Sequence, residues 1–396
     1  MGSVVILFIC LLSLSSNVEA SSNIGVNYGV LGNNLPSPYR SIELLTTMKA
    51  GRNLNSNPSI LAPGRVKIYD ANPDILRLLS TTNHEISGIA ANQSIADEWV
   101  RNNIFPYYQK TLIRYLLVGN EVLSYNSEQG HKMWHDLVPA MRNIKRALNS
   151  QKIGGIKIGT PLAMDVLEST FPPSSGTFRS DLRDNSTNSF FFIDAYPYFP
   201  WSQDPKNINL DFALFRGNIT TQDPGSGLIY RNLLDQMLDS VIFAMSKLGY
   251  SNIKLVISET GWPNSGDIEE TGTNIFNAAT YNRNLIQRMI TKPPIGTPAR
   301  PGVPIPIFIF SLFDENQKPG RGTERHWGLL HTDGTPMYDL DLTGKKPIAE
   351  YEPLPVPKNN APYKGKVWCV AANGAKEMEL AAALSYACNV ANMTCD

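Results

Sequence analysis

Cysteine is absent from the body of this 396-residue chain, between Cys10 and Cys369. No disulfide can therefore cross-link that stretch internally, and its stability must come from core packing. An excess of charge of either sign is also missing, because 35 Lys and Arg residues balance 35 Asp and Glu residues. This balance argues against nucleic acid as a partner, since nucleic-acid binding requires a basic surface.

A membrane-spanning run is missing from the N-terminal segment. Apolar residues fill positions 4–12, which is fewer than the roughly 18 residues that cross a bilayer, so a membrane anchor is the weaker alternative. Val18 and Ala20 stand at positions −3 and −1 of a cleavage site, and they predict a signal peptide over residues 1–20. We therefore expect a secreted protein of the extracellular space or cell wall, with the vacuole as a further destination. Four glycosylation sequons are compatible with this route: Asn92, Asn185, Asn218 and Asn392.

Eight β-rich runs alternate with helix-like stretches in the rest of the chain. The runs are residues 24–29, 65–70, 86–90, 113–119, 156–160, 190–196, 253–259 and 307–313. The helix-like stretches are residues 42–48, 75–80, 96–107, 134–148, 233–248 and 281–291. Several runs are nearly continuous in Val, Ile, Leu and Phe, which is typical of a parallel sheet covered on both faces. The pattern predicts an α/β fold, a (β/α)8 TIM barrel over residues 21–350, with a seven-unit count as the alternative.

The composition changes toward the C-terminus. Residues 351–367 are rich in proline and predict a stiff, extended linker. Residues 368–396 contain one helix-like stretch, 375–387, and are too few for an independent domain. They carry an odd number of cysteines, Cys369, Cys388 and Cys395, which leaves one thiol over in an oxidising compartment.

Acidic residues follow three of the predicted strands: Glu121, Glu259 and Glu315. Active sites of such barrels lie at the C-terminal ends of the strands. Cleavage of a glycosidic bond requires one protonated and one ionised carboxyl group. Glu121 and Glu259 suit these two roles, because their strands lie across the barrel from each other and both side chains can face one cleft. Aromatic residues that suit stacking on sugars follow the same strands: Tyr28, Tyr196, Tyr198, Phe199, Trp201 and Trp262. Taken singly, each acid also suits a helix cap and each aromatic a core position.

Patterns for other chemistries are missing. His131 and His135 have helical spacing, but no Glu completes a zinc-hydrolase motif, so we expect no metal. No Gly-x-Ser-x-Gly motif is present, and residues 225–227 lack the lysine of a phosphate loop. We expect no cofactor.

Four segments resemble the plant glucan endo-1,3-β-glucosidases, glycoside hydrolase family 17. They are residues 24–29 (IGVNYG), 118–123 (VGNEVL), 257–263 (ISETGWP) and 313–318 (FDENQK). The resemblance covers residues 21–351 and implies a (β/α)8 barrel and a retaining endo-hydrolase of β-1,3-glucans such as callose. We also expect the protein to be a monomer. It implies that Glu121 is the general acid/base and Glu259 the nucleophile. It further implies assisting roles for Glu315, Lys318 and Glu324, and substrate contacts for Tyr28, Asn120, Tyr196 and Trp262.

The sequence departs from this family at three places. Asp194 stands where the family usually carries Asn, and we expect this carboxyl to shift pKa values in the cleft or to alter subsite preference. Residues 51–64 form a longer link than usual, and residues 91–93 replace a Pro-Asn pair. Residues 368–396 resemble the first third of a cysteine-rich carbohydrate-binding module.

Three alternatives to a β-1,3-glucanase stay open from the sequence. The same carboxyl pair and aromatic residues also suit a mixed-linkage 1,3-1,4-β-glucanase or a transglycosylase that remodels wall glucan. A non-catalytic glucan-binding wall protein is the third, and the intact carboxyl pair argues against it.

Overall fold

The computed structural model describes residues 8–13, 23–49, 65–69, 86–108, 112–182, 191–364, 376–378 and 380–383. The chain divides into two compact units, Met1–Ala361 and Pro362–Asp396. The predicted helix over residues 75–80, the long link 51–64 and the three C-terminal cysteines lie outside the described residues. Of the predicted helix 375–387, only residues 376–378 and 380–383 are described, and most of them are helical.

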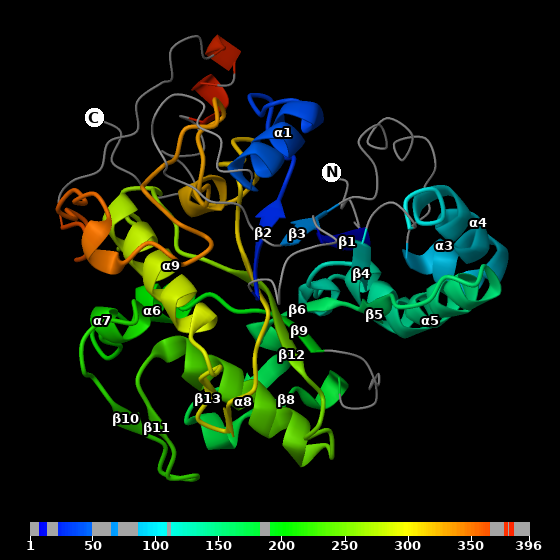
Figure 1. Cartoon of the computed structure of the whole chain (residues 1–396), viewed down its shortest axis with the longest axis horizontal. Helices are drawn as coiled ribbons and strands as arrows, with labels where there is room; N and C mark the ends of the chain where they lie inside the picture. Colours follow the sequence, from blue (N-terminus) through cyan, green and yellow to red (C-terminus); the bar gives the residue numbers. More distant parts are fainter. Residues whose placement is uncertain are drawn as a thin grey trace. The chain divides into compact units, whose positions relative to one another are not determined.

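The main sheet of the first unit closes on itself. Its nine strands follow the order β5-β4-β1-β3-β2-β15-β12-β9-β6. The two terminal strands, β5 and β6, are consecutive in the chain and separated by Thr160 alone, so the two edges of the sheet meet (Figure 1). The strands are β1 (Phe8–Ser13), β2 (Ile24–Tyr28), β3 (Arg65–Ile68), β4 (Leu112–Val118), β5 (Lys157–Gly159), β6 (Pro161–Ala163), β9 (Phe191–Asp194), β12 (Leu255–Thr260) and β15 (Ile307–Ile309). Apart from those of β1, the pairings in this sheet are parallel, which confirms the predicted barrel.

Seven of the eight predicted strands are present, and the third is wrong. Residues 86–90 belong to a helix, α3 (Ile86–Ala91), and the place between β3 and β4 is taken by β1, antiparallel to both. Ile86 and Ile89 are buried at helical spacing, and the Asn143 amide donates to the Ile89 and Ala90 carbonyls. Such a short apolar run suits a helix face as well as a strand. The strand β1 lies inside the predicted signal peptide, whose removal stays a prediction.

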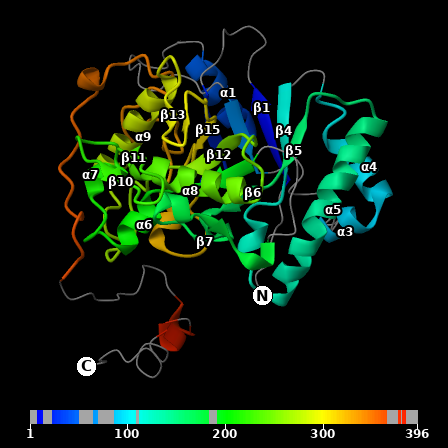
Figure 2. The ribbon, with the colours of Figure 1, turned by 90° about the horizontal axis from the view of Figure 1, so that it is seen from below.

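Five longer helices cover the outside of the barrel. They are α1 (Pro38–Lys49), α4 (Gln93–Asn103), α5 (Glu128–Ser150), α8 (Leu233–Lys247) and α9 (Ile275–Ile290). Figure 2 shows α3, α4 and α5 side by side on one flank. Each of the five helices begins at a capping side chain that accepts a backbone N–H bond, and such a cap contributes about 1 kcal/mol. The caps are Ser37, Asn92, Ser127, Asn232 and Asn274.

The remaining elements are short and lie in the connecting loops. They are α6 (Tyr198–Gln203), α7 (Leu210–Ala213), the strand pairs β7 (Leu167–Ser169) with β8 (Thr177–Phe178), β10 (Thr221–Gln222) with β11 (Ile229–Tyr230) and β13 (Gly296–Thr297) with β14 (Arg300–Pro301), and the 3₁₀ turns Val122–Ser124, Met164–Val166, Pro173–Ser175, Ser180–Leu182, Gly322–Arg325 and Ile348–Glu350. No helix among the described residues combines the length and the apolar character that a bilayer crossing requires.

The first part of the predicted linker packs against the barrel. Asn359 and Asn360 accept amide hydrogen bonds from Asn274 and Asn277 at the start of α9, each pair within 3.0 Å. The Gly272 N–H donates to the Asn359 carbonyl at 2.7 Å. The chain is therefore tied to the barrel as far as this contact.

A packed layer of side chains fills the barrel beneath the cleft. Leu117, Phe192, Val256 and Phe308, from four different strands, are fully buried against one another. Gly159 makes room for one of the aromatic rings, because a Cβ at Gly159 would lie 2.4 Å from the Phe192 ring. A layer of large and small residues in alternation supports the strand ends from below.

Replacing Gly159 by Ala is expected to destabilise the protein by about 1–3 kcal/mol, since the buried Phe192 ring must shift. Urea unfolding measures this loss. Gly154→Ala is the matched control, because Gly154 has no atom within 4 Å of its Cβ position. Equal urea midpoints for the two variants would contradict the packed layer.

Candidate active site

A cleft of about 450 Å³ opens at the C-terminal ends of the strands. Five carboxyl groups face it among its lining residues, which are Tyr69, Asn120, Glu121, Ser124, Ala163, Met164, Asp165, Asp194, Tyr196, Phe199, Pro200, Met237, Glu259, Phe310, Lys318, Glu324 and Trp327. A second cavity of about 120 Å³ lies between α5, α8 and the sheet, and its described lining contains no acidic or basic side chain. Of these two cavities, the first cleft is therefore the one whose lining can support acid–base chemistry.

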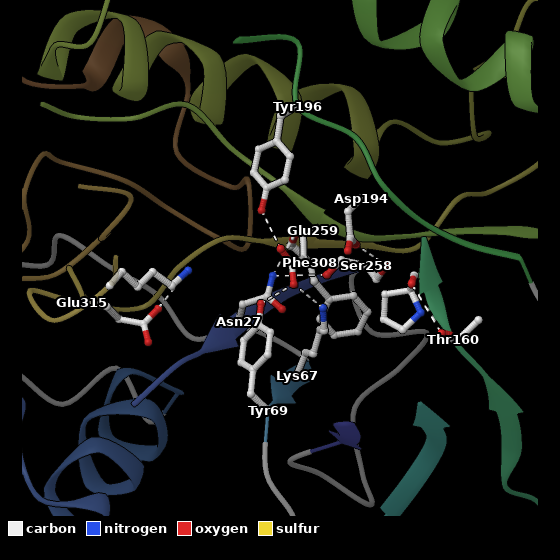
Figure 3. A network of polar contacts seen from close by, with 12 residues as sticks. Asn27, Lys67, Tyr69, Thr160, Asp194, Tyr196, Ser258, Glu259, Phe308 and Glu315 are labelled. Atoms are coloured by element: carbon white, nitrogen blue, oxygen red, sulfur yellow. Dashed lines mark hydrogen bonds and ion pairs between the residues drawn. The ribbon is translucent and has the colours of Figure 1, made fainter. Parts of the chain in front are cut away.

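Glu259 lies near the end of β12 and its side chain accepts three hydrogen bonds. Lys67 Nζ donates to Oε1 at 2.6 Å, Tyr69 donates to Oε1 at 2.5 Å, and Tyr196 donates to Oε2 at 2.7 Å. Figure 3 shows Tyr196 approaching from one side and Lys67 with Tyr69 from the other. Burial alone raises the pKa of Glu259, but the Lys67 charge and the hydrogen bonds outweigh it, so the pKa lies below its usual value. Glu259 is therefore held ionised.

Lys67 supplies the cation that this arrangement requires. It points inward from β3, its side chain is fully buried, and its ammonium forms an ion pair with Glu259. Tyr69, two residues further along, lies on the same face and carries its ring 4.8 Å from the ammonium. Sequence reasoning missed both residues, although a lysine inside a strand predicted to be buried on both faces was a signal for a buried partner.

Glu121 follows β4 in an unusual backbone conformation. Its φ is 49°, in the left-handed region, and Gly119 two residues earlier has φ 71°. A Cβ at Gly119 would lie 2.3 Å from Val122, so this turn requires glycine. The Glu121 N–H donates to the Pro161 carbonyl at 3.0 Å, which ties the turn to the neighbouring strand. The turn places the carboxyl in the cleft.

The two glutamates differ in protonation near neutral pH. Burial, and then the negative charge of Glu259, raise the pKa of Glu121 to about 7. Between the lowered pKa of Glu259 and about pH 7, Glu121 is therefore protonated while Glu259 is ionised. One proton donor and one carboxylate in a single cleft are the groups that glycosidic bond cleavage requires.

The three residues predicted to assist lie close to this pair but at different depths. Lys318 and Glu324 line the cleft, and the Lys318 ammonium lies 4.0 Å from the Phe310 ring centre. Burial foremost raises the pKa of Glu324. Glu315 lies behind them and is almost fully buried; it accepts the Leu31 N–H at 2.8 Å and pairs with Lys318 at 3.5 Å. Glu315 therefore orients Lys318.

The predicted substrate contacts divide into two groups. Asn120 and Tyr196 line the cleft. Tyr28 is not among the lining residues, and its ring packs edge-on against Phe313 at 6.3 Å. Trp262 is 1% exposed and donates from its indole to the Gly272 carbonyl at 2.8 Å. The structure places Trp262 in the core, and not in the cleft as predicted.

Aromatic rings form two layers along one wall. The first layer faces the cleft and contains Tyr196, Phe199, Phe310 and Trp327, whose ring centres lie 5.0 to 6.4 Å apart where they touch. The second layer lies behind it and contains Tyr198, Trp201, Trp262 and Tyr281. Phe310 and Trp327 were not predicted, because nothing in their local sequence separates a platform from a core ring.

The histidines of α5 do not form a metal site in the described part of the chain. The His131 ring packs on Trp134 at 4.3 Å, and no group of three or more His, Cys, Asp or Glu side chains among the described residues has the geometry to hold a metal ion.

A barrel with such a carboxyl pair at its strand ends is the architecture of a glycosyl hydrolase. The sequence matches the glycosyl hydrolases family 17 over residues 24–342. It is 56% identical to the probable glucan endo-1,3-beta-glucosidase A6 of Arabidopsis thaliana, over 96% of this chain and 80% of that protein. It is 35% identical to a glucan endo-1,3-beta-D-glucosidase of Olea europaea, over 97% of this chain and 83% of that protein.

A solved structure supports the same assignment. CJP38, a beta-1,3-glucanase and allergen of Cryptomeria japonica pollen, superimposes with a TM-score of 0.66 at 38% identity, and the match covers 80% of this chain and 97% of that one. The chain belongs to family 17 of the glycosyl hydrolases.

Replacing Lys67 by Met is expected to cost about 3–5 kcal/mol of stability at neutral pH, because Glu259 would stay as an uncompensated buried charge. Without Lys67, burial raises the pKa of Glu259 above that of an unfolded carboxyl. The loss should therefore shrink as the pH falls through that raised value, where folded Glu259 takes up a proton. Urea unfolding across a pH series measures both effects.

Lys157→Met is the matched control, since Lys157 is an exposed lysine on β5 and its loss should change stability by about 0.5 kcal/mol at most. If both lysine variants unfold at the same urea concentration, the buried pair does not hold the site together.

Proposed function

We propose that the protein is a secreted, retaining endo-hydrolase of (1→3)-β-D-glucosidic linkages in β-glucans such as callose. The observation that carries the proposal is the pair of carboxyls with opposite protonation, Glu121 and Glu259, in one cleft. The names of the relatives support the linkage, because two relatives matched by sequence and one matched by structure are described as β-1,3-glucanases or glucan endo-1,3-β-glucosidases.

The first half of the reaction forms a glycosyl-enzyme. The Glu259 carboxylate attacks the anomeric carbon, and the bond between that carbon and the glycosidic oxygen breaks. Glu121 transfers its proton to the departing oxygen, which leaves as a hydroxyl of the shortened glucan. Glu121 is now the carboxylate, and Glu259 is an ester.

The second half returns both glutamates to their starting states. Glu121 takes a proton from water, and the water oxygen bonds to the anomeric carbon as the ester bond to Glu259 breaks. Two displacements at the same carbon retain its configuration. Lys67, Tyr69 and Tyr196 stabilise the carboxylate that is released each time, and burial keeps the pKa of each tyrosine well above its usual value, so both phenols stay hydrogen-bond donors.

The aromatic wall suits a polysaccharide. Phe199 is partly exposed beside Tyr196 and Trp327, and rings of this kind stack on the apolar faces of sugars. Two sequons of the secretion proposal, Asn92 and Asn218, are exposed and so accessible to glycosylation.

The wild-type protein is expected to cut laminarin internally and to release β-configured reducing ends first. Glu121→Gln should lower kcat about 10²–10⁴-fold through loss of the acid, and Glu259→Gln should remove hydrolysis through loss of the nucleophile. A product time course with proton NMR of the new anomeric centre measures both. Glu98→Gln, at an exposed position on α4, is the control and should keep full activity.

Each rival has its own result in this experiment. New α-configured ends would overturn retention, and faster cutting of barley glucan than of laminarin would overturn the linkage. Products longer than the donor would indicate a transglycosylase. Binding of laminarin without release of reducing ends would overturn the hydrolase.

A further inference from the structure

A third buried carboxyl, Asp194, lies beside the catalytic pair and has no part in the reaction described above. It is the last residue of β9, and its Cα is the register partner of Glu259 on β12. Asp194 is 2% exposed and lines the cleft together with Glu121 and Glu259. Figure 3 shows it beside Ser258 and Glu259. A group in this position affects the charge of the nucleophile directly.

The hydrogen bonds of Asp194 are too few for an ionised carboxylate. Its Oδ1 accepts from the Ser258 hydroxyl at 2.5 Å. Its Oδ2 is buried and has no hydrogen-bond partner among the described residues. An ionised carboxylate has about four acceptor sites to satisfy, whereas a protonated one has fewer acceptor sites and carries one O–H donor. With the single hydrogen bond from Ser258, the carboxylate would leave more acceptor sites unsatisfied than the neutral acid does.

The charges around Asp194 also fit a neutral acid. The cation on β3, Lys67, lies against Glu259 at 2.6 Å. The other ionisable groups that surround the cleft are Glu121, Asp165, Glu315 with its partner Lys318, Glu324, Tyr69 and Tyr196. Burial, and then the charge of Glu259, raise the pKa of Asp194 well above its usual value, and Lys67 offsets only part of this. A second ionised carboxylate here would compete with Glu259 for one buried cation.

We propose that Asp194 stays protonated while the enzyme works and acts as a positioning residue. Its hydrogen bond with the Ser258 hydroxyl holds Ser258 next to Glu259. Because it is neutral, it does not compete with Glu259 for the charge of Lys67. The kinetic part of this proposal rests on the proposed function, whereas the protonation state does not.

Protonation is tested on the whole chain by comparing Asp194→Asn with the wild type in thermal unfolding. Unfolded Asp194 ionises above about pH 4, while folded Asp194 keeps its proton, so wild-type stability falls as the pH rises through this range. Asn has nearly the same shape and no proton to lose. The Tm of the Asn variant relative to the wild type should therefore rise steadily from about pH 4 to about pH 7. A Tm difference that stays constant, or that falls with pH, overturns the proposal.

Kinetics test the positioning role with a conservative and a disruptive variant. Asp194→Asn should keep kcat within about threefold of the wild type, whereas Asp194→Ala should lower kcat at least about tenfold with little change in KM. If Asn lowers kcat as much as Ala does, the charge of Asp194 is needed and the proposal is wrong. If Asp194→Ala does not fold, the Asn variant and the Tm series decide alone. If the wild type hydrolyses no glucan, the proposed function fails, and the Tm series still decides the protonation state.

Discussion

The ion pair between Lys67 and Glu259 determines the charges of the whole site. Because the Lys67 side chain is fully buried and lies 2.6 Å from Glu259, the pair fixes one negative charge at the floor of the cleft. That charge and burial together raise the pKa of Glu121 to about 7. Lys67 is ion-paired with Glu259, and its charge offsets only part of the rise in the pKa of Asp194. In the proposed reaction, this one buried contact therefore gives three carboxyls of a single cleft different roles: Glu259 as nucleophile, Glu121 as acid and Asp194 as a neutral group.

The barrel brings these groups together from distant parts of the chain. Lys67 comes from β3, Glu121 from the turn after β4, Asp194 from β9 and Glu259 from β12. Parallel strands in a closed barrel end at the same face, so these side chains meet there. The layer of Leu117, Phe192, Val256 and Phe308 supports that face from below, and the aromatic wall completes one side.

Most of the barrel strands and the two glutamates of the cleft were predictable from the sequence. The predictions that were wrong or missing have physical causes. The parallel strands follow from the continuous apolar runs, and the two glutamates proposed as catalytic follow from the residues at the ends of those runs. Residues 86–90 were wrongly predicted as a strand because a short apolar run suits both a strand and a helix, and contact with Asn143 of α5 favours the helix. Lys67 was missed because its partner lies 192 residues away. Trp262 was misplaced because a ring in a core and a ring in a cleft follow similar local sequences.

The pH dependence of kcat/KM on laminarin tests the division of charge between Glu121 and Glu259 most directly. Activity needs Glu121 protonated, so it should fall as the pH rises through about 7. It needs Glu259 ionised, so the acid limb should lie below the ordinary glutamate value of 4.5. The two limbs report apparent values of the coupled pair. Activity that stays level beyond about pH 9, or an acid limb near about pH 7, would contradict the account.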